Sequence, residues 1–274
     1  MESQWKVNGK TVLITGGASG LGSAKVEALL KEGAKAVAIL DIAENAVKEL
    51  IARCKPDSDR ITFIKCDVSD QDSLNKAFEQ VLSTFKRLDV IINCAGIMDD
   101  SPGQWSKSCD INLKALISLT WKGIDHMGKD KGGKGGTIVN VSSKAALIRT
   151  PVVPIYCATK SGVLQFSRCL TFGDFYERTG VRVLTICYST TNTGILKNLK
   201  YREHNENRGI FFEKLIDPAV FQKVESAVKT FMEMLQKGTC GSVWYSGDDK
   251  PGKDITPDIE EAFNILGRAI EHNM

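Results

Sequence analysis

The sequence is poor in the features that mark several common classes of protein. Its longest apolar runs, such as residues 36–40 and 90–92, are five residues or fewer, far short of the roughly 20 that cross a bilayer. The N-terminus carries Glu2 and no apolar stretch behind it, unlike a secretory signal. Lys and Arg total 36 against 33 Asp and Glu, a net charge of +3 with both signs interspersed. We therefore expect no membrane span and no binding of nucleic acid.

Histidine and paired cysteine motifs are also scarce. With only His126, His204 and His272, neither a zinc site nor a Ser-His-Asp triad is expected. The eight cysteines include no CxxC pair, and most of them lie in apolar segments that suit strands or helices. We therefore expect reduced thiols that pack as small hydrophobic groups, no metal site, and a cytoplasmic location.

What is present suits one globular domain. The 274 residues are 42% apolar and 25% charged, with 24 Gly and 7 Pro, which is typical of soluble globular proteins. A chain of this length buries about three quarters of its unfolded surface. We expect a single domain over residues 1–274.

Short β-branched runs alternate with longer amphipathic stretches along the first two thirds of the chain. Strands that are apolar on both faces and alternate with helices predict βαβ units and a parallel sheet. Right-handed crossovers then give an α/β fold, a single doubly wound parallel sheet of the Rossmann type flanked by helices on both faces. The strands are expected at 11–15, 36–40, 61–64, 88–92, 137–141 and 181–186, and the helices at 21–31, 44–54, 72–85, 105–127 and 156–176.

A glycine-rich turn, Thr15–Gly22 (TGGASGLG), follows the first predicted strand and opens the first helix. In a βαβ unit such a turn directs the amides of a helix N-terminus at a pyrophosphate, and glycines allow the close approach. The spacing GxxxGxG also suits a plain loop. Its place between strand and helix favours dinucleotide binding.

Asp41 ends the second predicted strand, 25 residues after Gly16. A carboxylate at this point accepts hydrogen bonds from the adenosine ribose and repels a 2′-phosphate, and the turn holds no Lys or Arg, so NAD is expected rather than NADP. Asp41 also suits a simple cap of the next helix. Asp67 and the run Asn93–Gly96 follow later strands, at the edge where open sheets bind ligands, although each also suits an ordinary turn.

Tyr156 and Lys160 form a YxxxK pattern on a predicted helix, 13 residues after Ser143 at the end of the fifth strand. Residues four apart lie on one helix face, so the phenol and the ammonium share a pocket. A nearby ammonium and an oxidised nicotinamide stabilise a phenolate. Tyr156 is therefore predicted to be the general base of alcohol oxidation and the general acid of carbonyl reduction.

Taken together, these motifs resemble the short-chain dehydrogenase/reductase family over about residues 8–195. The matching segments are TGGASGLG, Asp41, CDV with Asp67, NCAG, Asn112 in INLKAL, VSS ending at Ser143, and YCATK.

The resemblance implies a role for each member of the catalytic set. Ser143 would hydrogen-bond the substrate oxygen, and Tyr156 would move the proton. Lys160 would lower the pKa of Tyr156 and hold the nicotinamide ribose. Asn112 would hold a water in the proton relay, although it also suits an ordinary helix position. The cofactor-binding residues expected from the turn and the resemblance are Gly16, Ser19, Gly20, Leu21, Gly22, Asp41, Asp67, Val68, Asn93, Ala95, Gly96, Tyr156, Lys160 and Thr193.

Within the family, segments 96–100, 132–136 and 241–245 are most similar to insect-type alcohol dehydrogenases and hydroxyprostaglandin dehydrogenases. Val153 stands where the prostaglandin enzymes carry Gln, which points away from a prostaglandin substrate. Tyr188 and Ser189 replace the family's Pro-Gly, and a Cβ at Ser189 limits backbone approach to the nicotinamide. Val153 and Tyr188 are the expected substrate contacts.

Residues 194–214 resemble the family's substrate lid, or form a solvated helix, and their apolar positions favour a long-chain, isoprenoid or steroid-like compound. Residues 247–274 form a polar tail with a short amphipathic helix. Family analogy implies a homodimer built on helices 105–127 and 156–176. The sequence thus predicts an NAD-dependent oxidoreductase acting on a hydrophobic alcohol or carbonyl compound. Because of Tyr188 and Ser189, the alternative is a low-activity or silent protein of the same fold with a ligand-binding, storage or scaffold role.

Overall fold

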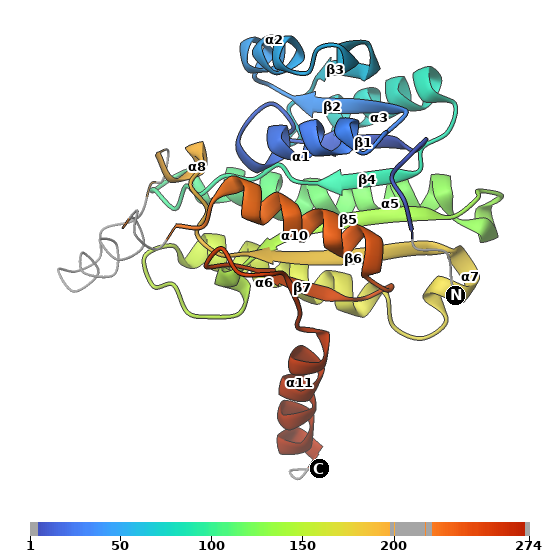
Figure 1. The fold of residues 1–274 in the computed structure, drawn as a ribbon. Helices are drawn as coiled ribbons and strands as arrows, with labels where there is room; N and C mark the ends of the chain where they lie inside the picture. The colour runs from blue at the N-terminus through green and yellow to red at the C-terminus, as the bar shows by residue number, and fades with distance from the viewer. Residues whose placement is uncertain (1–4, 198–199, 201–216, 218–220, 272–274) are drawn as a thin grey trace.

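The computed structural model describes residues 5–197, 200, 217 and 221–271. In this part of the chain eight strands form one sheet in the order β3-β2-β1-β4-β5-β6-β7-β8 (Figure 1). Neighbouring strands are parallel except for the pair β7 and β8. The predicted doubly wound sheet is confirmed. Its strands are β1 (Thr11–Thr15), β2 (Ala36–Asp41), β3 (Ile61–Lys65), β4 (Val90–Asn93), β5 (Gly136–Ser143), β6 (Val181–Tyr188), β7 (Val243–Ser246) and β8 (Lys253–Asp254).

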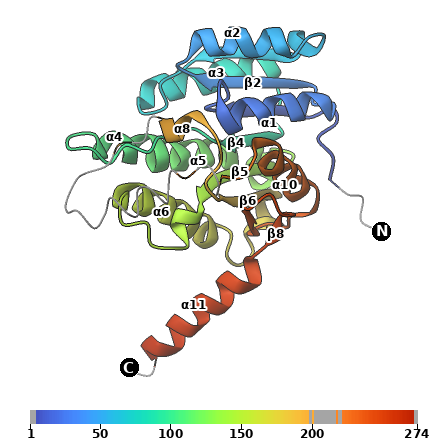
Figure 2. The same cartoon turned by 60° about the vertical axis from the view of Figure 1, so that its left-hand side comes forward.

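Helices cover both faces of the sheet, as Figures 1 and 2 show from two sides. Helices α1, α2 and α10 pack on one face, and α3, α5 and α6 pack on the other. The helices are α1 (Gly20–Lys31), α2 (Glu44–Arg53), α3 (Gln71–Phe85), α4 (Trp105–Cys109), α5 (Ala115–Met127), α6 (Pro154–Leu170), α7 (Phe175–Thr179), α8 (Gly194–Lys197), α10 (Val224–Lys237) and α11 (Thr256–Glu271).

Strand β1 shows why the central strands are apolar on both faces. All five of its residues are buried. Val12 and Ile14 lie in the core beneath α1 and α10, whereas Leu13 lies in the core beneath α3 and α5. Each of these side chains stabilises the fold by roughly 1.5–3 kcal/mol through removal of apolar surface from water.

The order of the strands creates the crevice that the site uses. Strand β1 pairs with β2 on one side and with β4 on the other. The connections that leave β1 and β4 therefore run to opposite faces, and they separate at the carboxyl edge of the sheet. The residues that follow β1, β4, β5 and β6 meet at this edge.

Two predicted helices differ in detail from those observed. The predicted helix 156–176 ends at Leu170, because Gly173 takes a left-handed conformation with φ of 70°, and α7 starts separately at Phe175. The predicted helix 105–127 is continuous but contains a π-helical turn at Asp110–Lys114. Helix α10 was not predicted.

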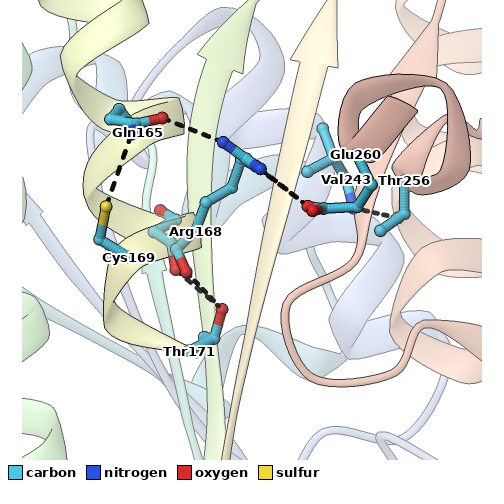
Figure 3. A network of polar contacts seen from close by, with 8 residues as sticks. Gln165, Arg168, Cys169, Thr171, Val243, Thr256 and Glu260 are labelled. Atoms are coloured by element: carbon cyan, nitrogen blue, oxygen red, sulfur yellow. Dashed lines mark hydrogen bonds and ion pairs between the residues drawn. The ribbon is translucent and has the colours of Figure 1, made fainter. Parts of the chain in front are cut away.

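The C-terminal helix α11 stands away from the body of the molecule (Figures 1 and 2). Near its start, Arg168 of α6 binds Glu260 through two nitrogens, at 2.9 and 3.2 Å (Figure 3). The same guanidinium lies 3.8 Å from the centroid of the Phe263 ring. Further along, Leu266 and Ile270 are exposed. Among the described helices, none combines the length and the apolar character of a membrane span.

Candidate active site

A cavity of about 330 Å³ opens at the carboxyl edge of the sheet. It collects residues that the sequence places far apart, from the turn after β1 to the loop after β6. The residues expected in the site that line the cavity are Gly16, Ser19, Gly20, Leu21, Gly22, Asp41, Asp67, Val68, Ala95, Gly96, Ser143, Val153, Tyr156, Lys160, Tyr188 and Thr193. Asn93 and Asn112 do not line it.

The glycine turn needs glycine for steric reasons. A Cβ on Gly16, where φ is 66°, would lie 2.8 Å from the Cα of Ala95, and a Cβ on Gly22 would overlap the carbonyl oxygen of Gly16. The backbone of the turn therefore packs tightly against the loop after β4, and Gly22 packs tightly against Gly16 within the turn. Helix α1 starts at Gly20 with no side chain capping its first amides. Free amides at a helix start beside an open cavity fit a cofactor pyrophosphate.

Asp41 lies at the end of β2 and faces the glycine turn. One of its carboxylate oxygens accepts a hydrogen bond from Ala18 N and the other accepts one from Ala43 N, both at 2.9 Å. The carboxylate therefore ties the turn to the start of the next connection, while it also lines the cavity. This position suits both recognition of an adenosine ribose and the capping role considered from the sequence.

Ser143, Tyr156 and Lys160 come together in the cavity from β5 and α6. Lys160 Nζ lies 5.7 Å from the centroid of the Tyr156 ring and donates a hydrogen bond to Val141 O at 3.0 Å. Ser143 Oγ accepts a hydrogen bond from Ala145 N at 3.1 Å, which leaves the hydroxyl proton of Ser143 available to another acceptor. The three groups are buried in the protein and meet at the cavity wall.

Burial dominates the electrostatics of this set. It raises the pKa of Tyr156 to about 12, against a hydrogen bond with Ser143 that favours the phenolate. It lowers the pKa of Lys160 to about 8. The expected lowering of the Tyr156 pKa by Lys160 is therefore not seen in the protein alone, since desolvation outweighs any effect of the neighbouring ammonium. A positive charge brought by a bound cofactor would act in the expected direction.

Asn112 lies in the π-helical turn at Asp110–Lys114. Its Oδ1 accepts a hydrogen bond from Ile97 N at 2.8 Å, and its Nδ2 donates to Ile97 O at 2.9 Å and to Thr159 Oγ1 at 3.3 Å. The amide therefore fixes the loop after β4, in keeping with the alternative of a residue satisfied by backbone contacts. A role in holding a relay water stays a prediction.

Asn93 turns away from the cavity. Its Nδ2 donates to Asn140 Oδ1 at 2.8 Å and to Thr120 Oγ1 at 3.1 Å, within a buried network. The side chain thus joins β4 to β5, and the expected contact with the cofactor does not follow from this geometry. Asp67 does line the cavity, and its carboxylate accepts hydrogen bonds from the amide and the hydroxyl of Ser69. These hydrogen bonds lower the pKa of Asp67.

Tyr188 ends β6 with its ring turned into the core. The ring packs beneath α1 and α10, only 4% of the residue is exposed, and its hydroxyl has no hydrogen-bond partner among the described residues. Lys25 Nζ lies 4.8 Å from the ring centroid. The ring of Tyr188, which stands where the family has proline, is therefore accommodated in the core. The cavity beside it stays open.

Sequence reasoning missed Gln222, a buried residue that holds the loop after β6. Its side chain donates to Thr191 Oγ1 at 2.8 Å and to Ser246 O at 3.1 Å, and it accepts from Ser246 Oγ at 3.0 Å. A Cβ on Gly20 would lie 3.3 Å from the Cβ of Thr193, so this loop reaches the glycine turn. A lone Gln carries no motif that could have drawn attention to it.

Asp100 was also missed as a site residue. It is 4% exposed, and its carboxylate accepts hydrogen bonds from Ile155 N at 2.6 Å and Tyr156 N at 3.1 Å, at the start of α6. Its own amide donates to Lys200 O at 2.9 Å. Asp100 thereby links the catalytic helix to the chain beyond α8. Most of the lid expected at 194–214 lies outside the described residues, which include only 194–197 and Lys200 there.

Comparison with known proteins agrees with this geometry. A family model described as short chain dehydrogenase matches residues 10–204. The chain belongs to this family. It is accordingly an oxidoreductase, and the resemblance predicted from the motifs is confirmed.

Individual relatives match over most of the chain. The 15-hydroxyprostaglandin dehydrogenase [NAD(+)] of Macaca fascicularis is 41% identical over 209 residues, 76% of each chain. Alcohol dehydrogenase 1 of Ceratitis cosyra is 34% identical over 195 residues, 70% of this chain and 74% of the relative. A 3-ketoacyl-(acyl-carrier-protein) reductase from Brucella melitensis, solved in complex with NADH, shares the fold with a TM-score of 0.73 at 22% identity, over 89% of this chain and 99% of that one.

Proposed function

We propose that this enzyme interconverts a hydrophobic alcohol and its carbonyl compound. The observation that carries the proposal is the convergence of Ser143, Tyr156 and Lys160 in one cavity that also reaches the glycine turn. A proton acceptor, a hydrogen-bond donor and a cofactor cradle on one cavity wall are the groups that hydride transfer from an alcohol requires.

NAD is the cofactor of this enzyme. The relatives at 40–41% identity carry NAD(+) in their names, and the carboxylate of Asp41 lies where a 2′-phosphate would be repelled. At the turn that holds Gly16 and Gly22, no side chain caps the first backbone amides of α1, so these amides stay available to a pyrophosphate. When bound, NAD supplies the acceptor for the hydride that leaves the alcohol carbon.

The protein's own residues manage the proton and the substrate oxygen. In the oxidation direction, the Tyr156 phenolate takes the hydroxyl proton of the alcohol, and the Ser143 hydroxyl donates a hydrogen bond to the same oxygen. Lys160, anchored on Val141 O, keeps a positive charge near the phenolate. In the reduction direction Tyr156 returns the proton to the carbonyl oxygen.

Apolar side chains line the cavity beside the catalytic set. Val153, Ala145 and Tyr156 belong to one buried cluster against which Met98 packs. Ile195 and Leu196 of α8 line the same cavity. Apolar side chains of this kind fit a long-chain, isoprenoid or steroid-like body better than a small polar alcohol.

A series of secondary alcohols from 2-propanol to 2-decanol, assayed with NAD⁺, tests the proposal. We expect kcat/KM to rise with chain length, since each added CH₂ buries apolar surface worth about 0.8 kcal/mol. Tyr156→Phe should lower kcat by about 10³-fold or more while the Kd for NADH stays within about twofold. Tyr176→Phe, at a half-exposed tyrosine on α7, is the matched control. Turnover retained by Tyr156→Phe would refute the assignment, and absence of both NADH binding and turnover would favour the silent alternative.

We also propose a homodimer built on α5 and α6. Trp121 of α5 is 47% exposed and stacks edge-on against Phe166 of α6, with ring centroids 6.2 Å apart. An exposed aromatic pair on two adjacent helices suits a protein interface. Sedimentation of the wild type and of Trp121→Glu would test it, with a dimer expected only for the wild type.

The eight free cysteines fit a reducing, cytoplasmic location, which cell fractionation would test.

A further inference from the structure

A buried lysine lies behind the end of the cavity that holds the catalytic set, here called the catalytic end. Lys25 belongs to α1, the helix that starts at the glycine turn, and it is fully buried. Its Nζ donates a hydrogen bond to Cys94 Sγ at 3.3 Å, and it lies 4.8 and 5.2 Å from the ring centroids of Tyr188 and Phe231. None of the ion pairs between described residues includes Lys25. Its charge is therefore not neutralised by a described carboxylate.

The groups around Lys25 suit a cation. The face of an aromatic ring is the negative side of its quadrupole and attracts an ammonium, most strongly where water is excluded. Lys25 lies over two such rings and has the Cys94 sulfur as the acceptor of one N–H. These groups stabilise the ammonium without cancelling its charge. Because the protein interior screens a charge less than water does, the field of Lys25 extends to the neighbouring cavity.

One layer of residues separates Lys25 from the cavity. Cys94 and Tyr188, which contact its Nζ, both belong to the residues that line the cavity. Two residues after Cys94, a Cβ on Gly96 would lie 3.5 Å from Lys160 Nζ, so this loop lies next to the catalytic set. The charge of Lys25 also acts on Lys160: burial lowers the pKa of Lys160, and Lys25 acts in the same direction. The field of Lys25 thus reaches the groups that serve hydride transfer.

The two ends of the cavity differ in charge. Among the described residues, the acidic ones that line the cavity are Asp41 and Asp67, which lie at the ends of β2 and β3. The lysines that line it are Lys144, directly after β5, and Lys160, which binds Val141 O of β5. In the sheet, β1 and β4 lie between these two groups. Positive charge therefore gathers at the catalytic end, where the nicotinamide has to lie in order to exchange a hydride with the substrate.

We propose that Lys25 makes this site bind NADH more tightly than NAD⁺. The nicotinamide ring carries a positive charge in NAD⁺ and none in NADH, so the ammonium repels the oxidised ring alone. Both forms carry the same pyrophosphate, so any attraction between Lys25 and the phosphates acts on them equally. By thermodynamic linkage, tighter binding of the reduced form raises the reduction potential of the bound couple. Bound NAD⁺ therefore accepts a hydride from the alcohol more readily than free NAD⁺ does.

The ratio of the two dissociation constants isolates this effect. The Kd for NADH is measured by cofactor fluorescence, and the Kd for NAD⁺ by displacement of NADH. We expect the wild type to bind NADH at least tenfold more tightly than NAD⁺. In Lys25→Met, which has similar length and no charge, this ratio should fall at least fivefold, which equals about 20 mV in the bound couple at about 30 mV per tenfold. Lys25→Arg, which keeps the charge, should stay within about twofold of the wild type.

Lys31→Met is the matched control, because Lys31 is an exposed lysine in the last turn of the same helix. It removes one positive charge where water screens it, so its ratio should equal that of the wild type. An unchanged ratio in Lys25→Met would overturn the proposal. An equal loss of affinity for NADH and NAD⁺ would also overturn it, since Lys25 would then act on the pyrophosphate that both forms share.

Two further measurements decide the matter if Lys25→Met does not fold. Lys25→Gln keeps an N–H donor for the Cys94 sulfur and has no charge, so its ratio should fall as in Lys25→Met. A wild type that binds NAD⁺ as tightly as NADH would overturn the proposal without any variant. The inference rests on the NAD site of the proposed function, but its readouts are cofactor affinities. A protein that shows the expected ratios and oxidises no alcohol would therefore contradict the proposed function alone.

Discussion

The carboxylate of Asp100 accepts a hydrogen bond from the backbone amide of Tyr156 at 3.1 Å. The same carboxylate binds the amide of Ile155, so it holds the first free N–H groups of the helix that carries the catalytic phenol. The position of Tyr156 thus depends on a residue 56 places earlier in the chain, in the loop after β4.

Asp100→Ala should lower both stability and turnover. Loss of a helix cap costs about 1–2 kcal/mol, and a freed N-terminus of α6 should lower kcat at least tenfold with little change in NADH affinity. Asp70→Ala is the matched control, because Asp70 caps α3 through Asp72 N and Ser73 N and is not among the residues that line the cavity. It should lose similar stability and keep its kcat. Asp100→Asn, which retains an acceptor oxygen, should recover part of the rate, and equal kcat losses in the two alanine variants would refute a positioning role.

Asp41→Ala should reverse part of the cofactor selectivity. Removal of the carboxylate ends the repulsion of a 2′-phosphate, and it also frees Ala18 N at the glycine turn. We expect the ratio of NADPH to NADH affinity to rise at least tenfold, measured by fluorescence titration. Glu44→Ala, an exposed carboxylate at the start of α2, should leave the ratio unchanged. An unaltered ratio in Asp41→Ala would mean that Asp41 only caps its connection.

Lys160 gives stability an unusual dependence on pH. Its pKa in the folded protein is about 8, against an ordinary 10.5, so between these values the unfolded chain binds a proton that the folded protein does not. The free energy of unfolding should therefore rise with pH across this window, relative to Lys160→Met. The rise is at most about 3.5 kcal/mol, since a pKa difference of one is worth about 1.4 kcal/mol. Denaturant titrations at pH 7.5, 9 and 10 would show it, and Lys48→Met, at an exposed lysine, should give a flat difference.

Gln222→Met should loosen the loop after β6. The substitution keeps the volume but removes the donors to Thr191 and Ser246, and unpaired buried acceptors cost about 1–3 kcal/mol each. Because this loop reaches Gly20 through Thr193, NADH affinity should fall about tenfold. Gln80→Met, at an exposed position on α3, should change neither affinity nor stability. Unchanged NADH binding in Gln222→Met would show that the loop holds its position without the buried amide.

Much of the fold could be predicted because local and global signals agree. Val12 and Ile14 point to one face of the sheet and Leu13 to the other, and all three are apolar. This pattern is typical of a central parallel strand. The motifs then place Gly16, Tyr156 and Ser143 at one edge, because parallel strands end together. Periodicity does not say which partner a helix face meets, so α10 and its buried Phe231 escaped prediction.

The orientation of polar side chains was the weaker part of the prediction. Asn93 and Asp67 both follow strands, yet Asn93 turns into a buried network and Asp67 into the cavity. The difference depends on Asn140 and Thr120, which lie on other elements and which a local motif cannot reveal. Lys25 is similar, since a lysine in an amphipathic helix normally faces solvent. Its burial depends on Cys94 and Tyr188, far along the chain.

The attachment of α11 at one end has a consequence for how the protein melts. Arg168 holds the first turns, at Glu260 and Phe263, while Leu266 and Ile270 further along are exposed. A helix of this length is marginal in water without tertiary contacts. Its amide hydrogens should therefore exchange in a gradient, slow near Ile259 and fast toward Glu271. Helical signal should be lost from this end at temperatures where the sheet is still intact, so the molecule unfolds in two cooperative units rather than one.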